Sequence, residues 1–369
     1  MKQQNMVSII SFTRTGNSLA QSIRQIVEEC SSEEEGSRKI LVQVQENRTC
    51  PGSLKEWCRD AFIQSQTLIF VGAAGIAVRL IAESVKDKYR DPAVLVVDEL
   101  GQFVIPILSG HVGGGNEFAL FLAEKLGAVP VITTATDLYG KFAVDVFAVK
   151  NRLFLSERRL AKEISAAILE GEKIGFSCEK QVLGRMPEEL IWLEEDSGTE
   201  LNGPIRYRIH VGVHKWEHHG RTLFLHPRAL ILGIGCKKGK SAEEIEAFVQ
   251  ENLWQNQFAR ESLLGAASVD LKKQEKGLLD FCSRWNLPFH TYSAQQLAEV
   301  TGTFTESVFV AETVGVGNVC ERAAAACAME FSGNKENNAL KHWEGLVPKT
   351  AGSGITLAVS ELEWSVEFE

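Results

Sequence analysis

The sequence predicts a multi-domain α/β protein, with Rossmann-like mixed or parallel sheets at its N-terminal and C-terminal ends and a small α+β region between them. Three observations predict this class. Strand-like and helix-like segments alternate near both ends, the pattern weakens from about residue 151, and 369 residues suffice for two to three domains of about 150 residues each. We therefore expect an N-terminal α/β domain over residues 1–148, a middle domain or linker over 149–227, and a C-terminal α/β domain over 228–369.

The N-terminal segments show this alternation most clearly. The apolar runs at residues 7–12 and 67–71 predict strands, and the stretches after them, at 18–29 and 75–85, have the spacing of amphipathic helices. Strands that alternate with helices form a mostly parallel sheet covered by those helices. The first domain is therefore expected to have this architecture.

The next two apolar runs, at residues 93–97 and 103–108, are joined by five residues that include Gly101. A link this short favours a hairpin with a glycine turn over a crossover, so we expect the sheet to be mixed. A helix over 117–126 and a short strand over 129–132 complete the domain.

The later elements follow the same periodicities. Residues 157–169 predict an amphipathic helix within the middle region. The C-terminal domain begins with a strand at 229–234 and a helix at 241–252, whose start carries a capping box formed by Ser241 and Glu244. Further strands are expected at 266–269, 307–310 and 355–359, and an alanine-rich helix at 319–329.

The bulk composition restricts the class of partner. A net charge of −9 argues against nucleic acid or an anionic membrane, because a broad basic surface usually binds these partners. The chain has no apolar stretch of about 18 residues, so we expect no membrane span. Eight scattered cysteines without a Cys-x-x-Cys pair indicate reduced thiols in a cytoplasmic protein and not a disulfide framework or a zinc ribbon.

The turn over residues 109–116 carries the most specific chemistry of the chain. Glycines let the backbone approach a ligand closely, and the helix start presents unpaired N–H groups that suit an anion or a developing oxyanion. His111 is the side chain there that can transfer a proton near neutral pH. We therefore expect an acid–base site with His111 as its principal acid or base, surrounded by the substrate-binding residues Ser109, Gly113, Gly114, Gly115 and Asn116.

Polar residues also follow two other predicted strands. Ligands of open α/β sheets gather at the carboxyl ends of strands, which makes the residues after 129–132 candidates for substrate binding: Thr133, Thr134, Thr136 and Asp137. Gly72 and Arg79 follow the strand at 67–71. Arg79 is expected to face either solvent or a carboxylate in the same cleft as His111.

Asp98 and Glu99 form an adjacent acidic pair in the expected hairpin. In a strand their side chains point to opposite faces, so the two carboxylates are not expected to share a proton. Either residue is a candidate for a single catalytic base. A hairpin turn that favours acidic residues explains the pair equally well.

The glycine-containing loop over residues 233–241 resembles a nucleotide-binding loop but lacks its spacing. Counting back from Gly239 puts Ile234 at the position where a P-loop needs its first glycine. Lys237 and Lys238 at a helix start suit carboxylates or phosphates, although lysines of a solvated turn would look the same. Cys236 beside them is either a thiol activated by the lysines or a small residue in a tight turn.

Five histidines, at positions 210, 214, 218, 219 and 226, initially suggest a metal site. The segment 205–216 alternates like a strand, which would put His210 and His214 on one face about 13 Å apart at roughly 3.3 Å per residue. That separation is too large for one ion. We therefore expect no metal site.

Taken together, these stretches resemble the CbiG family of cobalamin-biosynthesis proteins. The resemblance covers both ends of the chain in the family's order, and the middle region adds little to it. It lies in residues 71–79, 91–94, 97–99, 109–116, 130–137, 233–238, 241–245, 269–273, 318–324 and 347–349.

The resemblance implies a cobalt-precorrin-5A hydrolase of the anaerobic route. Water would open the δ-lactone on ring A of a cobalt corrinoid, and the bridge carbon would leave with its methyl group as acetaldehyde. Arg79, Lys237, Lys238 and Lys349 become candidates for contacts with the substrate's acetate and propionate arms. The resemblance implies no cofactor of the protein's own, because the cobalt comes with the substrate, and it suggests binding between the N-terminal and C-terminal domains.

Two other classes of function stay open at this stage. The C-terminal half resembles CobE, a stand-alone corrinoid-pathway protein, so a non-catalytic carrier of a pathway intermediate is the main alternative. A nucleotide-dependent enzyme is disfavoured by the failed loop spacing. Neighbouring enzymes of the pathway are candidate partners, and the oligomeric state is left open.

Overall fold

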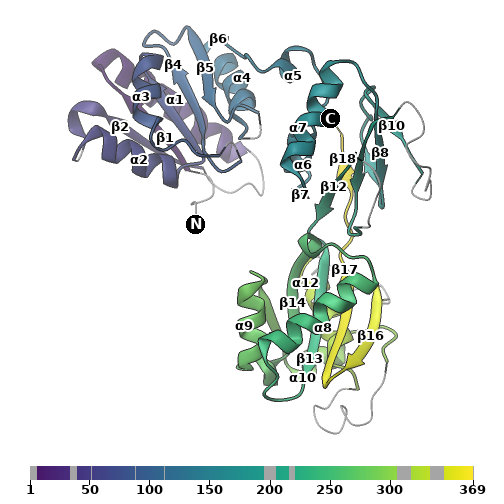
Figure 1. The fold of residues 1–369 in the computed structure, drawn as a ribbon. Coiled ribbons are helices and arrows are strands. Elements are labelled where there is room, and N and C mark those ends of the chain that lie inside the picture. Colours follow the sequence, from purple (N-terminus) through teal and green to yellow (C-terminus); the bar gives the residue numbers. More distant parts are fainter. Residues whose placement is uncertain are drawn as a thin grey trace. The chain divides into compact units, whose positions relative to one another are not determined.

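The computed structural model describes residues 6–33, 40–50, 52–87, 89–111, 113–194, 205–215, 221–305, 317–332 and 345–368 (Figure 1). The chain divides into two compact units, Met1–Lys141 and Phe142–Glu369. No helix in these ranges is both long and apolar enough to cross a membrane.

The first unit is a single sheet with the strand order β2-β1-β3-β4-β5-β6. Its strands are β1 (Met6–Ser11), β2 (Leu41–Glu46), β3 (Thr67–Val71), β4 (Ala93–Val97), β5 (Phe103–Leu108) and β6 (Val129–Pro130). Strands β2, β1, β3 and β4 are parallel, whereas β4 and β5 form an antiparallel hairpin. The prediction of a mixed sheet with a hairpin is therefore confirmed.

Helices cover both faces of this sheet. They are α1 (Arg14–Glu33), α2 (Leu54–Gln64), α3 (Ala74–Ile81) and α4 (Gly115–Leu126); the short α5 (Ala135–Leu138) follows β6. Side chains such as Ile23 of α1 and Leu122 of α4 pack on one face, and Phe62 of α2 and Ile81 of α3 pack on the other. A strand that is buried on both faces has a continuous run of apolar residues in the sequence. This explains why β3 and β4 are recognisable from the sequence alone.

The direction of the last two strands determines where the loops of this unit lie. Strand β5 runs antiparallel to β4, and β6 runs parallel to β5. The loops after β5 and β6 therefore lie at one edge of the sheet, whereas the loops after β1, β3 and β4 lie at the opposite edge. This topology creates two separate groups of loops.

The second unit begins with a lobe built on the sheet β10-β8-β11-β12-β7. Its elements are α6 (Val144–Lys150), β7 (Leu153–Leu155), α7 (Arg158–Leu169), β8 (Ile174–Cys178), β9 (Val182–Leu183), β10 (Leu190–Trp192), β11 (Tyr207–Val211) and β12 (Arg221–Pro227). Only β7 is antiparallel to its neighbour in this sheet. Helices α6 and α7 pack on one face of the sheet.

The end of the chain completes the core of this lobe. Strand β18 (Val366–Glu367) pairs with β9, and Phe368 stacks on Phe147 of α6 with the ring centroids 4.7 Å apart. A contact between residues so far apart in the sequence leaves no local pattern that could predict it.

The C-terminal lobe contains the sheet β15-β14-β13-β17-β16. Its elements are β13 (Leu230–Cys236), α8 (Ala242–Gln255), β14 (Leu263–Val269), α9 (Lys276–Arg284), β15 (Phe289–Tyr292), α10 (Ala294–Glu299), α12 (Cys320–Phe331), β16 (Val347–Gly352) and β17 (Ile355–Glu361). The capping box of α8 is confirmed, because the Glu244 amide donates to Ser241 Oγ at 3.2 Å and the Ser241 amide donates to Glu244 Oε2 at 2.9 Å. The strand expected at residues 307–310 lies outside the described residues.

The α/β class with several mixed or parallel sheets is confirmed. The domain borders expected after residues 148 and 227 stay predictions. The first compact unit ends at Lys141, and α6 already contributes Val144 and Phe147 to the core of the next lobe.

Candidate active site

Hydrogen bonds within the loop after β5 fix its conformation. The Gly114 amide donates to His111 O at 3.2 Å, and the Gly115 amide donates to Ser109 O at 3.3 Å. A Cβ on Gly113 would lie 2.5 Å from Ser109 Cβ, so only glycine allows this packing. The expectation that the Gly114 and Gly115 amides face a ligand is therefore corrected, because both amides are used inside the loop.

Asn116 connects this loop to the loop after β6. Its side chain is buried, and Nδ2 donates to Thr134 Oγ1 at 2.9 Å and to Asp137 Oδ2. A Cβ on Gly110 would lie 2.3 Å from Asn116 Oδ1, so the close approach of Gly110 also depends on glycine. We infer that Asn116 is a positioning residue that holds Asp137, and not a direct ligand of the substrate.

His111 and Asp137 form an acid–base pair at this edge of the sheet. His111 Nε2 lies 3.3 Å from Asp137 Oδ1 and 3.4 Å from the hydroxyl of Thr136, which is buried. The His111 side chain is 20% exposed and that of Asp137 is 34% exposed, so both are accessible to water or a ligand. A carboxylate in this position orients the imidazole and stabilises its charged form during proton transfer.

Two further predicted residues lie in the same two loops. Ser109 has a left-handed backbone with a φ of 50°, and its hydroxyl donates to Asp91 O at 3.3 Å, which fixes the loop to the start of β4. Thr133 is exposed. The structure therefore brings His111, Asn116 and the residues after β6 together, as their places after neighbouring strands suggested.

Asp98 and Glu99 lie at the opposite edge of the sheet. Asp98 accepts the amides of Phe103 at 2.6 Å and Leu100 at 3.1 Å, so it stabilises the hairpin turn. Glu99 accepts a hydrogen bond from the hydroxyl of Thr13. The five residues of β4, about 16 Å at roughly 3.3 Å per residue, separate this edge from that of His111. The two acids therefore cannot act on the same bond as His111.

Gly72 and Arg79 belong to the same edge as Glu99. The Gly72 amide donates to Val97 O at 2.8 Å at the end of β4. Arg79 Nη1 lies 3.4 Å from Gly75 O in the first turn of α3 and thus points back toward that edge. Of the two expectations for Arg79, a cleft shared with His111 is excluded because β3 and β5 run in opposite directions, whereas a side chain that faces solvent agrees with its exposure.

The predicted lysines belong to the second unit. Lys237 and Lys238 are exposed in the loop after β13, and the Lys237 amide donates to Gly354 O at 2.9 Å. Burial raises the pKa of the Cys236 thiol, and the charges of Lys272 and Lys240 oppose this only in part. This direction favours a small residue in a tight turn over an activated thiolate.

The backbone of Lys349 contacts a buried carboxylate, that of Glu321, which the sequence interpretation missed. Glu321 is 1% exposed and accepts the Lys349 amide at 2.6 Å, the Thr305 amide at 2.7 Å and hydroxyl at 2.9 Å, and Asn318 Nδ2 at 2.8 Å. It joins β16, the start of α12 and Thr305. The only local signal is a glutamate in the first turn of a helix.

A second missed carboxylate lies among the histidines. Strand β11 ends at Val211 and the chain turns, so His214 Nδ1 lies 3.0 Å and His210 Nε2 lies 3.2 Å from the same atom, Glu179 Oε1. The expected separation of about 13 Å along one strand is therefore wrong. Glu179 also accepts the amides of Val213 and His214, which anchors the chain segment that leads out of β11.

These contacts predict a pH dependence of stability. Burial alone would raise the pKa of Glu179, but hydrogen bonds from His210 and His214 and the charge of His214 outweigh it and hold the pKa far below its usual range. The stabilisation is therefore present above the ordinary glutamate pKa of 4.5 and is lost as the pH falls below it. We expect Glu179→Gln to lower the free energy of unfolding by about 2 to 3 kcal/mol at pH 7.

This difference is measured by urea unfolding of both proteins at several pH values. It should be present at pH 7 and shrink as the pH falls below about 4.5, where Glu179 of the unfolded chain takes up a proton. The matched control is Glu172→Gln, which removes a more exposed glutamate paired with Arg206 and should cost less than about 1 kcal/mol. A difference between wild type and Glu179→Gln that does not change with pH would contradict the assignment.

Fold and site together define a multi-lobed α/β protein whose N-terminal unit holds an accessible His–Asp acid–base pair. The comparisons with known proteins specify the class further. Family models match residues 56–137 (Cobalamin synthesis G N-terminal), 142–227 (Cobalamin biosynthesis central region) and 230–360 (Cobalamin synthesis G C-terminus).

Curated relatives agree with these matches. A cobalt-precorrin-5A hydrolase of Salmonella typhimurium is 34% identical over 74% of this chain and 79% of its own length. The corresponding protein of Priestia megaterium is 29% identical over 81% of this chain and 83% of its own. A crystal structure of a cobalamin biosynthesis protein G homolog from Sulfolobus solfataricus aligns over 97% of this chain and 98% of its own, with 22% identity and a TM-score of 0.42. The chain belongs to the CbiG family of cobalamin biosynthesis proteins.

Proposed function

We propose that this protein is a cobalt-precorrin-5A hydrolase that opens the ring-A δ-lactone of a cobalt corrinoid and releases acetaldehyde. The similarity to curated hydrolases over most of the chain carries this proposal. The His111–Asp137 pair supports it, because lactone hydrolysis and loss of a two-carbon aldehyde both need a proton moved at the reacting centre.

In this proposal His111 takes the proton from the attacking water while Asp137 holds the imidazole in position. Water adds to the lactone carbonyl, the ring C–O bond breaks, and the alkoxide that forms receives the proton back from His111. Neutral His111 then removes the proton of the new hydroxyl, the C–C bond between the bridge carbon and the macrocycle breaks, and acetaldehyde leaves. The electron pair of that bond stays on the macrocycle, which takes up the proton held by His111. The Gly113 amide is the candidate donor to the oxyanion, because the amides of Gly114 and Gly115 are bonded within the loop.

The remaining parts of the proposal concern ligands and location. The protein needs no cofactor of its own, since the cobalt belongs to the substrate. The exposed Lys237 and Lys238 are suited to bind carboxylate arms of the macrocycle. Because the eight cysteines of the sequence follow no disulfide-like spacing, we propose a cytoplasmic location.

The test is anaerobic incubation of the purified protein with the cobalt lactone substrate, with acetaldehyde trapped enzymatically. The proposal expects acetaldehyde and a corrinoid product that has gained one water and lost two carbons. Binding of the lactone without release of acetaldehyde would instead support the non-catalytic carrier.

A further inference from the structure

The sheet of the middle lobe buries an arginine near the start of β11. Side chains alternate along this strand, so Tyr207, Ile209 and Val211 enter the core beneath α7, whereas Arg208 and His210 project from the opposite face. Arg208 is only 5% exposed. A guanidinium at this depth is rare, because burying a charge is costly unless a partner compensates it.

Arg208 has no such partner in the described part of the chain. Its Nε is buried without a hydrogen bond, and no carboxylate lies within ion-pair distance among the described residues. Burial lowers the pKa of Arg208, and no neighbouring charge opposes that effect. Arginine retains its proton in proteins, so the cost of burial is not relieved by neutralisation.

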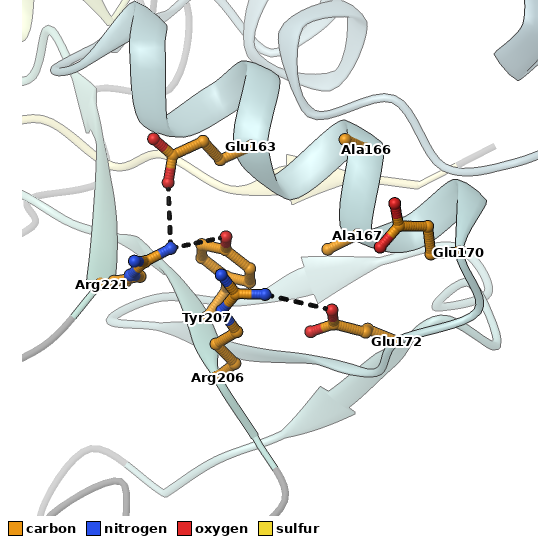
Figure 2. Close-up of a pocket in the computed structure, with 8 residues that line it drawn as sticks. All are labelled: Glu163, Ala166, Ala167, Glu170, Glu172, Arg206, Tyr207 and Arg221. Atoms are coloured by element: carbon orange, nitrogen blue, oxygen red, sulfur yellow. Dashed lines mark hydrogen bonds and ion pairs between the residues drawn. The ribbon is translucent and has the colours of Figure 1, made fainter.

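Two neighbouring arginines provide a direct contrast. Arg206 and Arg221 flank the Tyr207 ring in a pocket of about 370 Å³ on the α7 side (Figure 2). Arg206 Nη1 lies 3.4 Å from Glu172 Oε1, and Arg221 Nη1 lies 3.2 Å from Glu163 Oε2 and 2.8 Å from the Tyr207 hydroxyl. These side chains are 55% and 49% exposed. The exposed arginines are thus paired, and the buried one is not.

The neighbours of Arg208 across the sheet provide a hydroxyl and no charge. They are Gly175 on β8, over which Leu193 and Ile205 pack, and Thr222 on β12, whose side chain is on the same face as Arg208 because Leu223 enters the core. The carboxylate of Glu179, which follows β8 and contacts His210 on this face, already accepts hydrogen bonds from His210, His214 and two backbone amides. No carboxylate of this face is therefore available to Arg208 in the described structure.

We propose that Arg208, with the Thr222 hydroxyl beside it, binds the carboxylate or phosphate group of a small ligand on this face of the middle sheet. A guanidinium and an oxyanion form two parallel charge-assisted hydrogen bonds, and a site shielded from water strengthens them. The inference stands on this lobe alone and does not depend on the proposed reaction.

The test is thermal unfolding of the full chain in sodium propionate, sodium phosphate or sodium chloride at equal ionic strength. We expect propionate or phosphate to raise the unfolding midpoint above that in chloride, by about 5 °C when the anion exceeds its dissociation constant about a hundredfold. A response to propionate alone identifies a carboxylate site, and a response to phosphate alone identifies a phosphate site.

Matched variants locate the effect. Arg208→Met is expected to lose the anion response and to be at least as stable as wild type in chloride, because it removes an uncompensated buried charge. Arg206→Met, two residues away, is expected to keep the full response. An anion response that persists in Arg208→Met, or a wild type that does not distinguish the three salts, overturns the proposal.

Hydrogen exchange keeps the proposal testable if Arg208→Met does not fold. In wild type, the effective anion should slow amide exchange in β8, β11 and β12 relative to chloride. Slowing that spares these strands and appears elsewhere in the chain would contradict a site at Arg208.

Discussion

Replacing His111 with alanine is expected to lower the rate of acetaldehyde release by about 100- to 10,000-fold, the usual contribution of a general acid or base. His111 Nε2 is oriented by Asp137 at 3.3 Å, and the side chain is 20% exposed, so removing it takes away the proton carrier and leaves the core intact. The measurement is enzymatic trapping of acetaldehyde under anaerobic conditions, with thermal unfolding to check the fold.

Two further measurements separate this role from a structural one. Added imidazole should restore part of the activity of His111→Ala, because it can enter the vacated space and carry the proton. Asp137→Asn should lower the rate less than His111→Ala and change its pH profile, because it alters the orientation and charge stabilisation of the imidazole. Turnover of His111→Ala close to that of wild type would remove His111 from the mechanism.

The largest loss of stability is expected for Glu321→Ala, at about 3 to 5 kcal/mol. Glu321 is 1% exposed, and its carboxylate accepts hydrogen bonds from four donors of Thr305, Asn318 and Lys349. The substitution therefore leaves these buried N–H and O–H groups without an acceptor and opens a cavity. Urea unfolding measures the loss. Amide exchange in α12 and β16 should show that it is confined to the C-terminal lobe.

The matched control is Glu243→Ala. Glu243 is also the second residue of its helix, but its side chain is 66% exposed and pairs with Arg284 at the surface. This variant should change the free energy of unfolding by no more than about 1 kcal/mol. Equal effects of the two substitutions would show that the donors around Glu321 contribute little.

Much of the fold was predictable because its signals are local. Strands β3, β4 and β5 are apolar runs of five or six residues whose expected and observed limits coincide. The hairpin follows from the short link with Gly101, and the start of α8 follows from Ser241 and Glu244. Each of these features depends on residues close together in the sequence, where periodicity and turn chemistry determine the conformation.

The composition of the site was only partly predictable. His111 and Asn116 were recognised in a glycine-rich turn, and Asp137 among the polar residues at the carboxyl end of a strand; the structure brings them together. Asp98 was a candidate base or a turn residue, and Arg79 was expected to face either solvent or the cleft of His111; both lie at the other edge of the sheet. Strand direction decides this point, and a pattern of apolar residues does not encode direction.

The sequence by itself determined the α/β class, most elements of the first unit, the turn with His111 and the membership in a family that its motifs suggested. Only the tertiary structure decided which polar groups meet. Glu179 contacts His210 and His214, and Glu321 contacts Lys349, across separations of about 30 residues. Arg208 looks like any polar residue of an alternating strand, and its burial without a partner appears only when the strands are assembled. Hydrogen bonds and desolvation depend on which distant segments pack together, and local periodicity carries no information about that choice.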